Sequence, residues 1–367
     1  MIKTLFLLTD LSVANGVTAF AMSYLRTMDH DRIRVDFALY HGVQSPYARE
    51  IESYGGKVFV LPSVKRIDRH IRFCKKILEK EQYQIIHDNV QVISVPFMYL
   101  AKKQGVPVRI LHVHSTKMSE YAIKEIGNRF VFPLLLSQST AYFACGQKAG
   151  KATLGKRHFR VIPNTIAPGT VEYSLRTREN TRKAEAAEGR IVIATVARAT
   201  PAKNPIFALK VIKRLMEQGQ PVVYWWIGGG PLETEMRRFI HANGMEDCVK
   251  LLGSRQDMKE LYQAADLFFL PSVFEGLPLT GIEAQAYGLP CVVSDAVTGE
   301  FVFTDLVRFV NVNADPDAWT EAIREQMKRI TERNSRREEL MKSRFTSEKA
   351  GERLTAAYEK LLEGENV

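Results

Sequence analysis

Short apolar runs recur along the whole chain with helical patterns between them, and this alternation restricts the fold more than any other feature. Strands of a buried parallel sheet read as nearly continuous apolar runs, and a crossover helix joins each to the next. We therefore expect strands at residues 4–8, 35–40, 57–62, 84–88, 108–114, 141–145, 160–164, 191–198, 222–228, 249–253, 267–271 and 291–295. A polar, irregular segment at 165–190 interrupts the pattern, which then restarts. The sequence thus predicts an α/β protein with two doubly wound, Rossmann-like domains.

The expected boundaries place one domain at 1–168, a second at 190–345 and a final helix at 346–367. A chain of 367 residues is long for a single core and suits two such domains. No apolar run reaches the about 20 residues that span a bilayer, and the start MIKTLFLLTD suits a first strand better than a signal peptide. We therefore expect a cytoplasmic protein. Buried thiols are expected at four cysteines that form no CxxC pair: Cys74, Cys145, Cys248 and Cys291.

Positive charge is concentrated in the first part of the chain. Residues 1–168 contain 24 lysines and arginines against 12 aspartates and glutamates, whereas the remainder contains 27 against 29. A basic domain of this kind implies an anionic partner. Within it, segment 64–80 combines seven lysines and arginines with an apolar stripe of Ile67, Ile71, Cys74 and Leu78. A charge run usually marks a solvated face, but we favour contact with an anionic membrane surface. Nucleic acid is disfavoured because no reading module accompanies the charge.

Two glutamates stand eight residues apart in the stretch 267–295, LFFLPSVFEGLPLTGIEAQAYGLPCVVSD. Ligands of doubly wound sheets bind in the crevice outside the carboxyl ends of strands. Glu275, on the loop after a buried strand, and Glu283, in the following helix, would therefore point at one ligand. Glu283 has another explanation, since Thr280 and Glu283 have the spacing of a capping box. Glu275 has none, because an unpaired carboxylate is normally avoided on such a loop.

Two cations follow the first strand of the second domain. Arg198 ends this strand, and Lys203 comes just before a helix that begins near Asn204. Cations beside the amino terminus of a helix can bind a diphosphate, although the loop could also be merely basic and solvated.

The turn Gly228-Gly229-Gly230 follows the next strand. Its glycines could let the backbone approach a ligand closely, or they could simply make a turn. The segment lacks the third glycine of GxGxxG, and the following strand does not end in an acidic residue. A nicotinamide dehydrogenase is therefore disfavoured.

The first domain offers weaker signals. Asn15-Gly16 lies between the first strand and its helix, where amides could meet a phosphate or form an ordinary tight turn. His112 and His114 end the strand in RILHVHS, and we expect them to face opposite sides of the sheet, so that only one faces the crevice. A histidine there is more often structural, and no third ligand at suitable spacing supports zinc. The Asp-x-Asp pairs at 29–31 and 315–317 are typical of turns or helix caps, so no metal site is expected.

Together these segments resemble the retaining glycosyltransferases of family four, which have the GT-B fold, and in particular the bacterial capsular and exopolysaccharide members. The most specific part is EGLPLTGIEAQAYGLPCVVSD, which is similar to the family's Glu-x7-Glu motif. The spacing of Arg198 and Lys203, the GGGPL turn and LLGSRQDMKELYQAADLFFLPS follow the family's order, and ILHVHS, ACGQKAG and VIPNTI are similar in the first domain. The resemblance covers nearly the whole chain. It implies two Rossmann-like domains facing a cleft, with the final helix crossing back to the first domain.

This resemblance implies that the second domain binds a nucleotide-sugar, expected to be UDP-linked, and that the first binds a lipid-linked saccharide acceptor. Arg198 and Lys203 would neutralise the diphosphate, Glu283 would hold the ribose, and Glu275 would hold hydroxyls of the transferred sugar. His114, with His112 as its rival, would lie beside the anomeric carbon. The remaining donor contacts would be Gly16, Gly228, Arg255, Gly276 and Leu277.

The same resemblance implies retention without a metal ion or another cofactor, with the leaving phosphate taking the acceptor's proton. The enzyme would work in the cytoplasm, peripherally at the inner face of the cell membrane. Two segments depart from the family: Asn15-Gly16-Val17-Thr18 replaces Gly-Gly followed by an acidic residue two positions on, and VAR replaces the common VGR. The first departure keeps open an alternative, a catalytically idle homologue that binds a nucleotide-sugar or a partner protein.

Overall fold

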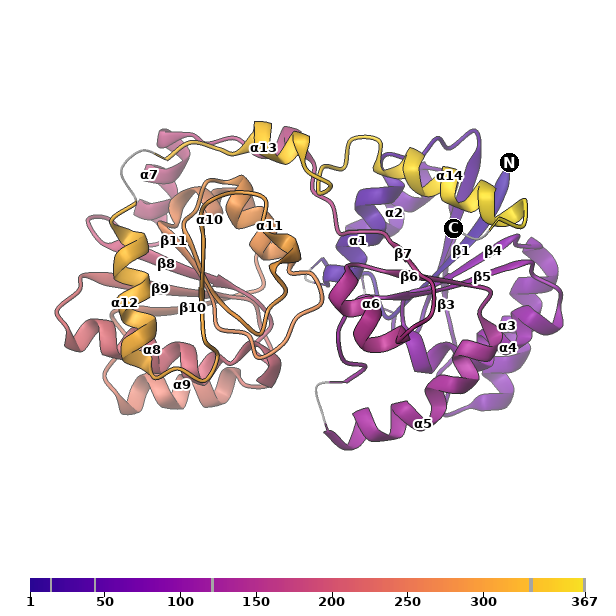
Figure 1. Ribbon diagram of the computed structural model, residues 1–367, viewed down its shortest axis with the longest axis horizontal. Coiled ribbons are helices and arrows are strands. Elements are labelled where there is room, and N and C mark those ends of the chain that lie inside the picture. Colours follow the sequence, from indigo (N-terminus) through magenta and orange to yellow (C-terminus); the bar gives the residue numbers. More distant parts are fainter. Residues whose placement is uncertain (14, 43, 120–121, 330–332, 366–367) are drawn as a thin grey trace. The chain divides into compact units, whose positions relative to one another are not determined.

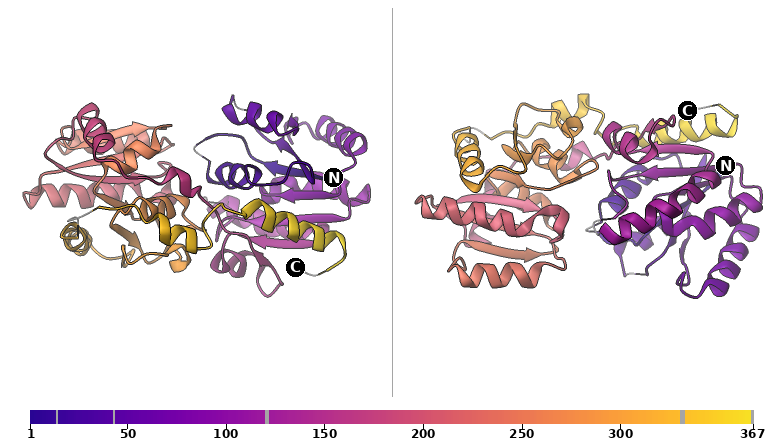
Figure 2. Two further views of the ribbon diagram at one scale, coloured as in Figure 1. Left: turned by 90° about the horizontal axis from the view of Figure 1, so that it is seen from above. Right: turned by 60° about the horizontal axis from the view of Figure 1, so that its bottom comes forward.

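The computed structural model describes residues 1–13, 15–42, 44–119, 122–329 and 333–365, and for residue 122 the backbone alone. These residues form two compact units. Unit 1 comprises residues 1–165 together with the chain from 347 onward, and unit 2 comprises 166–346. Within the described ranges, each unit is built on one parallel sheet with helices on both faces (Figures 1 and 2). The predicted α/β architecture of two doubly wound domains is confirmed.

The sheet of unit 1 has the strand order β3-β2-β1-β4-β5-β6-β7, and its paired strands run parallel. Its strands are β1 (Ile2–Leu8), β2 (Ile33–Leu39), β3 (Val58–Val60), β4 (Ile85–Asp88), β5 (Val108–Val113), β6 (Ala141–Ala144) and β7 (Arg160–Val161). Its helices are α1 (Gly16–Leu25), α2 (Pro46–Ser53), α3 (Ile67–Glu81), α4 (Val95–Lys103), α5 (Ala122–Gln138), α6 (Gln147–Leu154) and α14 (Ala350–Leu362), with the 3₁₀ turn η1 (Gln91–Ser94). The order changes direction between β1 and β4, so this is the switch point of unit 1.

The sheet of unit 2 has the order β10-β9-β8-β11-β12-β13, again with parallel pairing. Its strands are β8 (Ile191–Val196), β9 (Val222–Ile227), β10 (Val249–Gly253), β11 (Leu267–Leu270), β12 (Cys291–Ser294) and β13 (Val307–Val310). Its helices are α7 (Leu175–Ala184), α8 (Pro205–Glu217), α9 (Glu233–Ala242), α10 (Met258–Ala264), α11 (Leu279–Ala286), α12 (Pro316–Met327) and α13 (Arg337–Lys342), with 3₁₀ turns η2 (Pro168–Thr170), η3 (Pro201–Lys203) and η4 (Gly299–Phe301). Here the order changes direction between β8 and β11.

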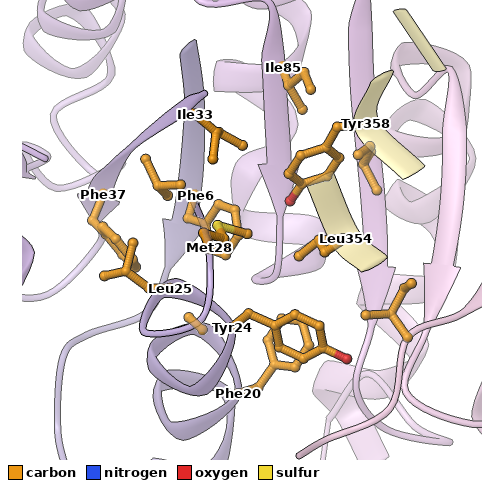
Figure 3. Close-up of a cluster of buried hydrophobic side chains, with 14 of the residues drawn as sticks. Phe6, Phe20, Tyr24, Leu25, Met28, Ile33, Phe37, Ile85, Leu354 and Tyr358 are labelled. Atoms are coloured by element: carbon orange, nitrogen blue, oxygen red, sulfur yellow. The ribbon is translucent and has the colours of Figure 1, made fainter. Parts of the chain in front are cut away.

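Both faces of the unit 1 sheet are packed with apolar side chains. One face meets α1 and α14, which contribute Phe20, Leu25 and Leu354 to a core shown in Figure 3. The other face meets α3, α4 and α5. Strands buried on both faces explain why the sequence reads as continuous apolar runs rather than as an alternating pattern. The four cysteines are buried thiols outside any disulfide, as predicted.

The last helix, α14, packs in the core of unit 1 although it follows unit 2 in the sequence. It lies very close to the end of α1: a Cβ at Gly351 would stand 2.3 Å from the carbonyl carbon of Thr27. The Gly351 N–H donates to Thr27 Oγ1 at 2.9 Å. Further along the helix, the Tyr358 ring is fully buried next to Leu354 (Figure 3). Glycine at the contact therefore allows the helix to bring a tyrosine into the core.

Candidate functional site

The switch point of unit 2 brings two sequence-predicted segments together. Strands β8 and β11 are neighbours, so the loops at their carboxyl ends, 197–204 and 271–278, leave the sheet side by side. In doubly wound sheets this position is where ligands bind. The Val273 N–H donates to the Ala202 carbonyl at 2.8 Å, which ties the two loops together.

Lys203 and Glu275 form an ion pair across these two loops. Ser272 Oγ also donates to Glu275 Oε1 at 3.1 Å. The side chains of Lys203 and Glu275 are only 22% and 11% exposed, so each charge is partly desolvated and depends on the other. The structure thus joins two residues that the sequence assigned to different parts of a ligand.

Arg198 follows β8 and is exposed to solvent. Within the described part of the chain, its guanidinium has no hydrogen-bond or ion-pair partner. A cation without a partner, next to a cation already paired with a carboxylate, leaves the site with net positive charge. This arrangement suits an anionic group such as a diphosphate.

The glycine turn after β9 packs against the loop after β8. Gly228 has φ +130°, and a Cβ there would stand 2.2 Å from the Ala197 carbonyl oxygen. A Cβ at Gly230 would stand 2.6 Å from the Ala199 carbonyl oxygen. The contact between the two backbones is sufficient to explain both glycines, because no side chain fits between them.

Glu283 lies in the second turn of α11 and is half-buried. It accepts a hydrogen bond from the Tyr262 hydroxyl at 2.7 Å. Burial raises the pKa of the Glu283 carboxyl to about 7, and the Tyr262 hydrogen bond acts in the opposite direction. The capping-box explanation does not hold, because the N-cap of α11 is Pro278 and no side chain caps this helix. Gly276 and Leu277, between the two glutamates, are buried.

Arg255 lies in the loop after β10 and pairs with two carboxylates. Its Nε and Nη2 donate to Asp257 at 2.7 and 2.5 Å, and its Nη1 donates to Glu185 at 2.8 Å. These two acids raise the pKa of the guanidinium further above its usual range. The Arg255 side chain therefore joins the end of α7 to the loop after β10. Its expected contact with the donor remains a prediction.

In unit 1, Gly16 and His114 lie at the carboxyl edge of the sheet. Gly16 is the first residue of α1, where the Asn15 side chain caps the helix by accepting the Val17 N–H at 3.0 Å. A Cβ at Gly16 would meet nothing within 4 Å, so the space beside it is open. His114 Nε2 lies 2.9 Å from Asn89 Oδ1, just after β4. Because an amide oxygen only accepts, Nε2 carries the proton and Nδ1 is an acceptor.

The expectation that His112 and His114 face opposite sides of the sheet was wrong. Their ring centroids are 4.0 Å apart, and both rings pack edge-on against Phe20. The physical reason is the strand period of two, which places side chains two residues apart on the same face. His112 is fully buried and His114 only half-buried, so His114 is the more accessible of the two.

A third histidine, His87 on β4, extends this row and is fully buried. His87 Nδ1 lies 2.5 Å from the Tyr358 hydroxyl of α14, and His87 Nε2 lies 3.0 Å from His112 Nδ1. Burial lowers the pKa of His114 to about 3 and lowers the pKa values of His87 and His112 well below their usual range. All three rings are therefore neutral at physiological pH, and none can supply a positive charge.

A hollow of about 250 Å³ opens next to this edge of the unit 1 sheet. It is lined by Val90, Gln91, Val92, Ile93, Met118 and Asn128. Buried Asp88 fixes the backbone of one wall, since it accepts from Val90 N–H at 2.9 Å and from Ser94 Oγ at 2.5 Å. Amide groups of Gln91 and Asn128 beside apolar side chains suit a small polar ligand with an apolar side.

Sequence comparison decides the family. EpsF of Bacillus subtilis strain 168, named as a candidate glycosyltransferase, is 30% identical over 325 residues, which cover 84% of this chain and 83% of EpsF. Residues 177–344 also match the family described as Glycosyl transferases group 1. This chain belongs to the group 1 glycosyltransferases. The family that the sequence motifs suggested is thereby confirmed for this glycosyltransferase.

Two further comparisons concern more distant proteins. The glycosyltransferase is 27% identical, over 237 residues covering 60% of each chain, to the UDP-Gal:alpha-D-GlcNAc-diphosphoundecaprenol alpha-1,3-galactosyltransferase of Escherichia coli. Its structure matches that of Anabaena Alr3699/HepE in complex with UDP-glucose with a TM-score of 0.81 and 16% identity, covering 98% of this chain and 100% of that chain. At this identity the likeness establishes the shared fold. The glycosyltransferase has the predicted two-domain GT-B fold.

Several residues at these edges were missed by the sequence reasoning. They are Tyr262, His87, Asp88 and Asn89. The last three form the run HDN at the carboxyl end of an expected strand, and polar residues at that position were a usable signal. Tyr262 lies inside a helix of the glycosyltransferase and gave no such signal.

Across the residues that the structure describes, no three histidine, cysteine or acidic side chains are grouped so that they could hold a metal ion. Within the same ranges, none of the helices of the glycosyltransferase has the length and apolarity required to cross a bilayer.

Proposed function

We propose that this glycosyltransferase moves a sugar, with retention of anomeric configuration, from a UDP-linked donor to a lipid-linked saccharide in surface polysaccharide synthesis. The single observation that carries the proposal is the Lys203–Glu275 ion pair beside exposed Arg198 at the switch point of unit 2. The donor and acceptor classes are supported by the name of the Escherichia coli relative, a UDP-galactose-dependent enzyme acting on a diphosphoundecaprenol-linked sugar. The UDP-glucose complex of the Anabaena protein supports the same donor class.

Donor binding would use the groups at the ends of β8 and β11. Arg198 and Lys203 would bind the diphosphate, and Glu283 would accept hydrogen bonds from the ribose hydroxyls. When the diphosphate pairs with Lys203, Glu275 is released to accept hydrogen bonds from hydroxyls of the transferred sugar. The ion pair thus stabilises both charges in the free enzyme and is exchanged for ligand contacts on binding.

The chemical step breaks the bond between the anomeric carbon and the diphosphate oxygen, and the electron pair leaves with UDP. The acceptor hydroxyl forms the new bond on the same face of the sugar, and its proton passes to the leaving phosphate oxygen. Negative charge develops on the diphosphate, where two preorganised cations stabilise it and take the part that a metal ion plays elsewhere. We therefore propose a metal-independent reaction that needs no other cofactor.

The acceptor would bind unit 1. The hollow lined by Gln91 and Asn128 has the mixture of amide and apolar groups that a saccharide requires. His114, neutral at physiological pH, would contact the reacting sugar as a hydrogen-bonding group, and the Gly16 N–H at the start of α1 would meet the distal phosphate. The basic surface of α3 would hold the enzyme on the anionic inner face of the cell membrane, in the cytoplasm.

Thermal-shift measurements test the donor site. We expect UDP and UDP-sugars, with EDTA present, to raise the melting temperature, while GDP, ADP and TDP do so less. Arg198→Ala should lose most of this stabilisation. A retained product anomer, measured by NMR after transfer to a diphosphate-linked saccharide, tests the reaction. No response to any nucleotide would overturn the proposal and favour the alternative of an idle homologue that binds a partner protein.

A further inference from the structure

Helix α5 exposes a row of large apolar side chains to solvent. Ile123 is 87% exposed, Ile126 59%, Phe130 80% and Leu134 56%. The spacing of three, four and four residues places all of them on one stripe of the helix. A soluble protein rarely leaves such a contiguous stripe uncovered unless the stripe binds something.

The opposite stripe of α5 is fixed in unit 1, so the exposed row cannot turn inward. Phe132 and Leu135 are buried in the core beneath the helix. Glu125 accepts the N–H groups of Met118 and Ser119 at 2.9 Å each, which anchors the first turn. Because Glu125 is the one acidic residue of α5 and its carboxylate is used there, the outer side of the helix carries no exposed carboxylate.

The surroundings of the row are basic. Lys124 and Arg129 flank it on α5 itself, with Arg129 Nε 3.3 Å from Glu125 Oε1. Helices α3, α4 and α5 cover the same face of the sheet, with α4 in contact with both others (Figure 1). Seven basic residues of the α3 region are all exposed: Lys65, Arg66, Arg69, Arg72, Lys75, Lys76 and Lys80.

The same helical layer exposes further apolar groups. The expected apolar stripe of α3 is buried only in its second half, at Cys74 and Leu78, whereas Ile67 and Ile71 are 43% and 38% exposed. On α4, Tyr99 is 54% exposed. Apolar and basic side chains therefore lie together on one layer of unit 1, where α3 also exposes Asp68 and Glu79.

We propose that α5 is a membrane-inserting helix that lies in the plane of an anionic lipid surface. Its row of Ile123, Ile126, Phe130 and Leu134 enters the boundary between headgroups and acyl chains, while the basic residues of α3 contact lipid phosphates. Helices of this kind bind through buried apolar area together with attraction to anionic lipid. This inference rests on the membrane association proposed above for α3 and deepens it, but it does not depend on the donor and acceptor chemistry.

A second copy of the chain fits the row less well. A symmetric contact places the same surface on both sides, so the basic layers of two copies would face one another. Like charges across an interface oppose association. An anionic bilayer supplies the complementary charge as well as an apolar medium.

Vesicle sedimentation with the full chain tests the proposal. We expect binding to phosphatidylcholine vesicles that contain phosphatidylglycerol, and little binding to phosphatidylcholine alone. The double variant F130S/L134S should bind the anionic vesicles at least about tenfold more weakly, because two inserting side chains are lost. The matched control is L175S, which removes an apolar side chain 61% exposed in unit 2 and should leave binding unchanged.

A fluorescent variant reports insertion directly. The natural tryptophans, Trp225, Trp226 and Trp319, are all buried in unit 2, so they give a constant background. Phe130→Trp should shift its emission to shorter wavelength when anionic vesicles are added. UDP-induced stabilisation of each variant shows that the protein is folded and tests the donor site separately. Unchanged vesicle binding by F130S/L134S would overturn the proposal, as would a lipid-free dimer that this double variant abolishes.

Discussion

Lys203 and Glu275 neutralise one another across two neighbouring loops at the switch point of unit 2. The sequence suggested each residue for a different part of a nucleotide-sugar, a cation for the diphosphate and a carboxylate for the sugar. The ion pair holds both charged groups in one contact, in which their charges neutralise one another. A ligand that carries phosphate next to sugar hydroxyls can replace both halves of that contact at once.

Arg198→Ala and Lys203→Ala are expected to weaken UDP binding by different amounts. Arg198 is exposed, so its removal deletes only its proposed contact with the diphosphate, and we expect a loss of about tenfold. Lys203→Ala also leaves Glu275 uncompensated near the phosphates, so the loss should be greater. Adding Glu275→Gln to Lys203→Ala should recover part of the affinity. Isothermal titration calorimetry measures all three, and equal losses without recovery would show that the pair does not control binding.

Glu275→Gln should separate binding from turnover. The amide still occupies the loop but loses the charge that, in the proposed role, accepts hydrogen bonds from sugar hydroxyls. We expect turnover to fall by about 100-fold, while UDP affinity changes only a few-fold because the phosphate contacts remain. Glu235→Gln, at an exposed glutamate of α9, is the control and should leave both unchanged. Near-normal turnover of Glu275→Gln would refute its proposed role.

The pKa of Glu283 predicts a pH dependence of stability. Its carboxyl has a pKa of about 7 in the folded protein, above the ordinary glutamate value of 4.5. Because the folded state binds the proton more tightly, this contribution is complete below about pH 4.5 and is lost as the pH rises through 7. It amounts to about 3 kcal/mol at most, and less where solvent reaches the half-buried group. Urea unfolding from pH 5 to 8 should show a smaller slope for Glu283→Gln than for the natural protein; parallel profiles would contradict the assignment.

The alternation of apolar runs was enough to predict the two sheets and twelve of their strands. It missed β13 (Val307–Val310), an edge strand with the half-exposed sequence VRFV. A short edge strand buries little, so its sequence carries no long apolar run. The pattern of apolar residues therefore identifies buried strands well and edge strands poorly.

The candidate site was predictable in its residue types but not in its contacts. Strand ends and helix starts located Glu275, Arg198 and Lys203, because those positions follow from local sequence. Which cation pairs with which carboxylate depends on the order of strands in the sheet. A single sequence does not reveal that order. The ion pair between Arg255 and Glu185 could not be predicted for the same reason. Glu185 lies in the segment 165–190, which the sequence predicted to be irregular.

Tyr358→Phe should destabilise unit 1 through His87. The tyrosine hydroxyl lies 2.5 Å from His87 Nδ1 in a fully buried place, and its loss leaves that nitrogen without its partner. We expect a cost of about 1–3 kcal/mol in the free energy of unfolding. Tyr99→Phe makes the same chemical change at a ring that is 54% exposed and should cost almost nothing. Equal effects of the two substitutions would show that the buried contact does not contribute.

Adjacent glycines of one turn offer the sharpest test of backbone packing in unit 2. An alanine Cβ at position 228 would stand 2.2 Å from the Ala197 carbonyl oxygen, and the φ of +130° is unfavourable for any L side chain. At position 229 the nearest group is Glu233 Oε2 at 3.8 Å, an ordinary contact. Gly228→Ala should therefore lower the free energy of unfolding by about 2 kcal/mol or more, and Gly229→Ala by less than about 1 kcal/mol. Because Gly228 touches the loop that carries Arg198, its substitution should also weaken UDP binding. Equal stability of the two variants would show that the turn after β9 can move away from β8.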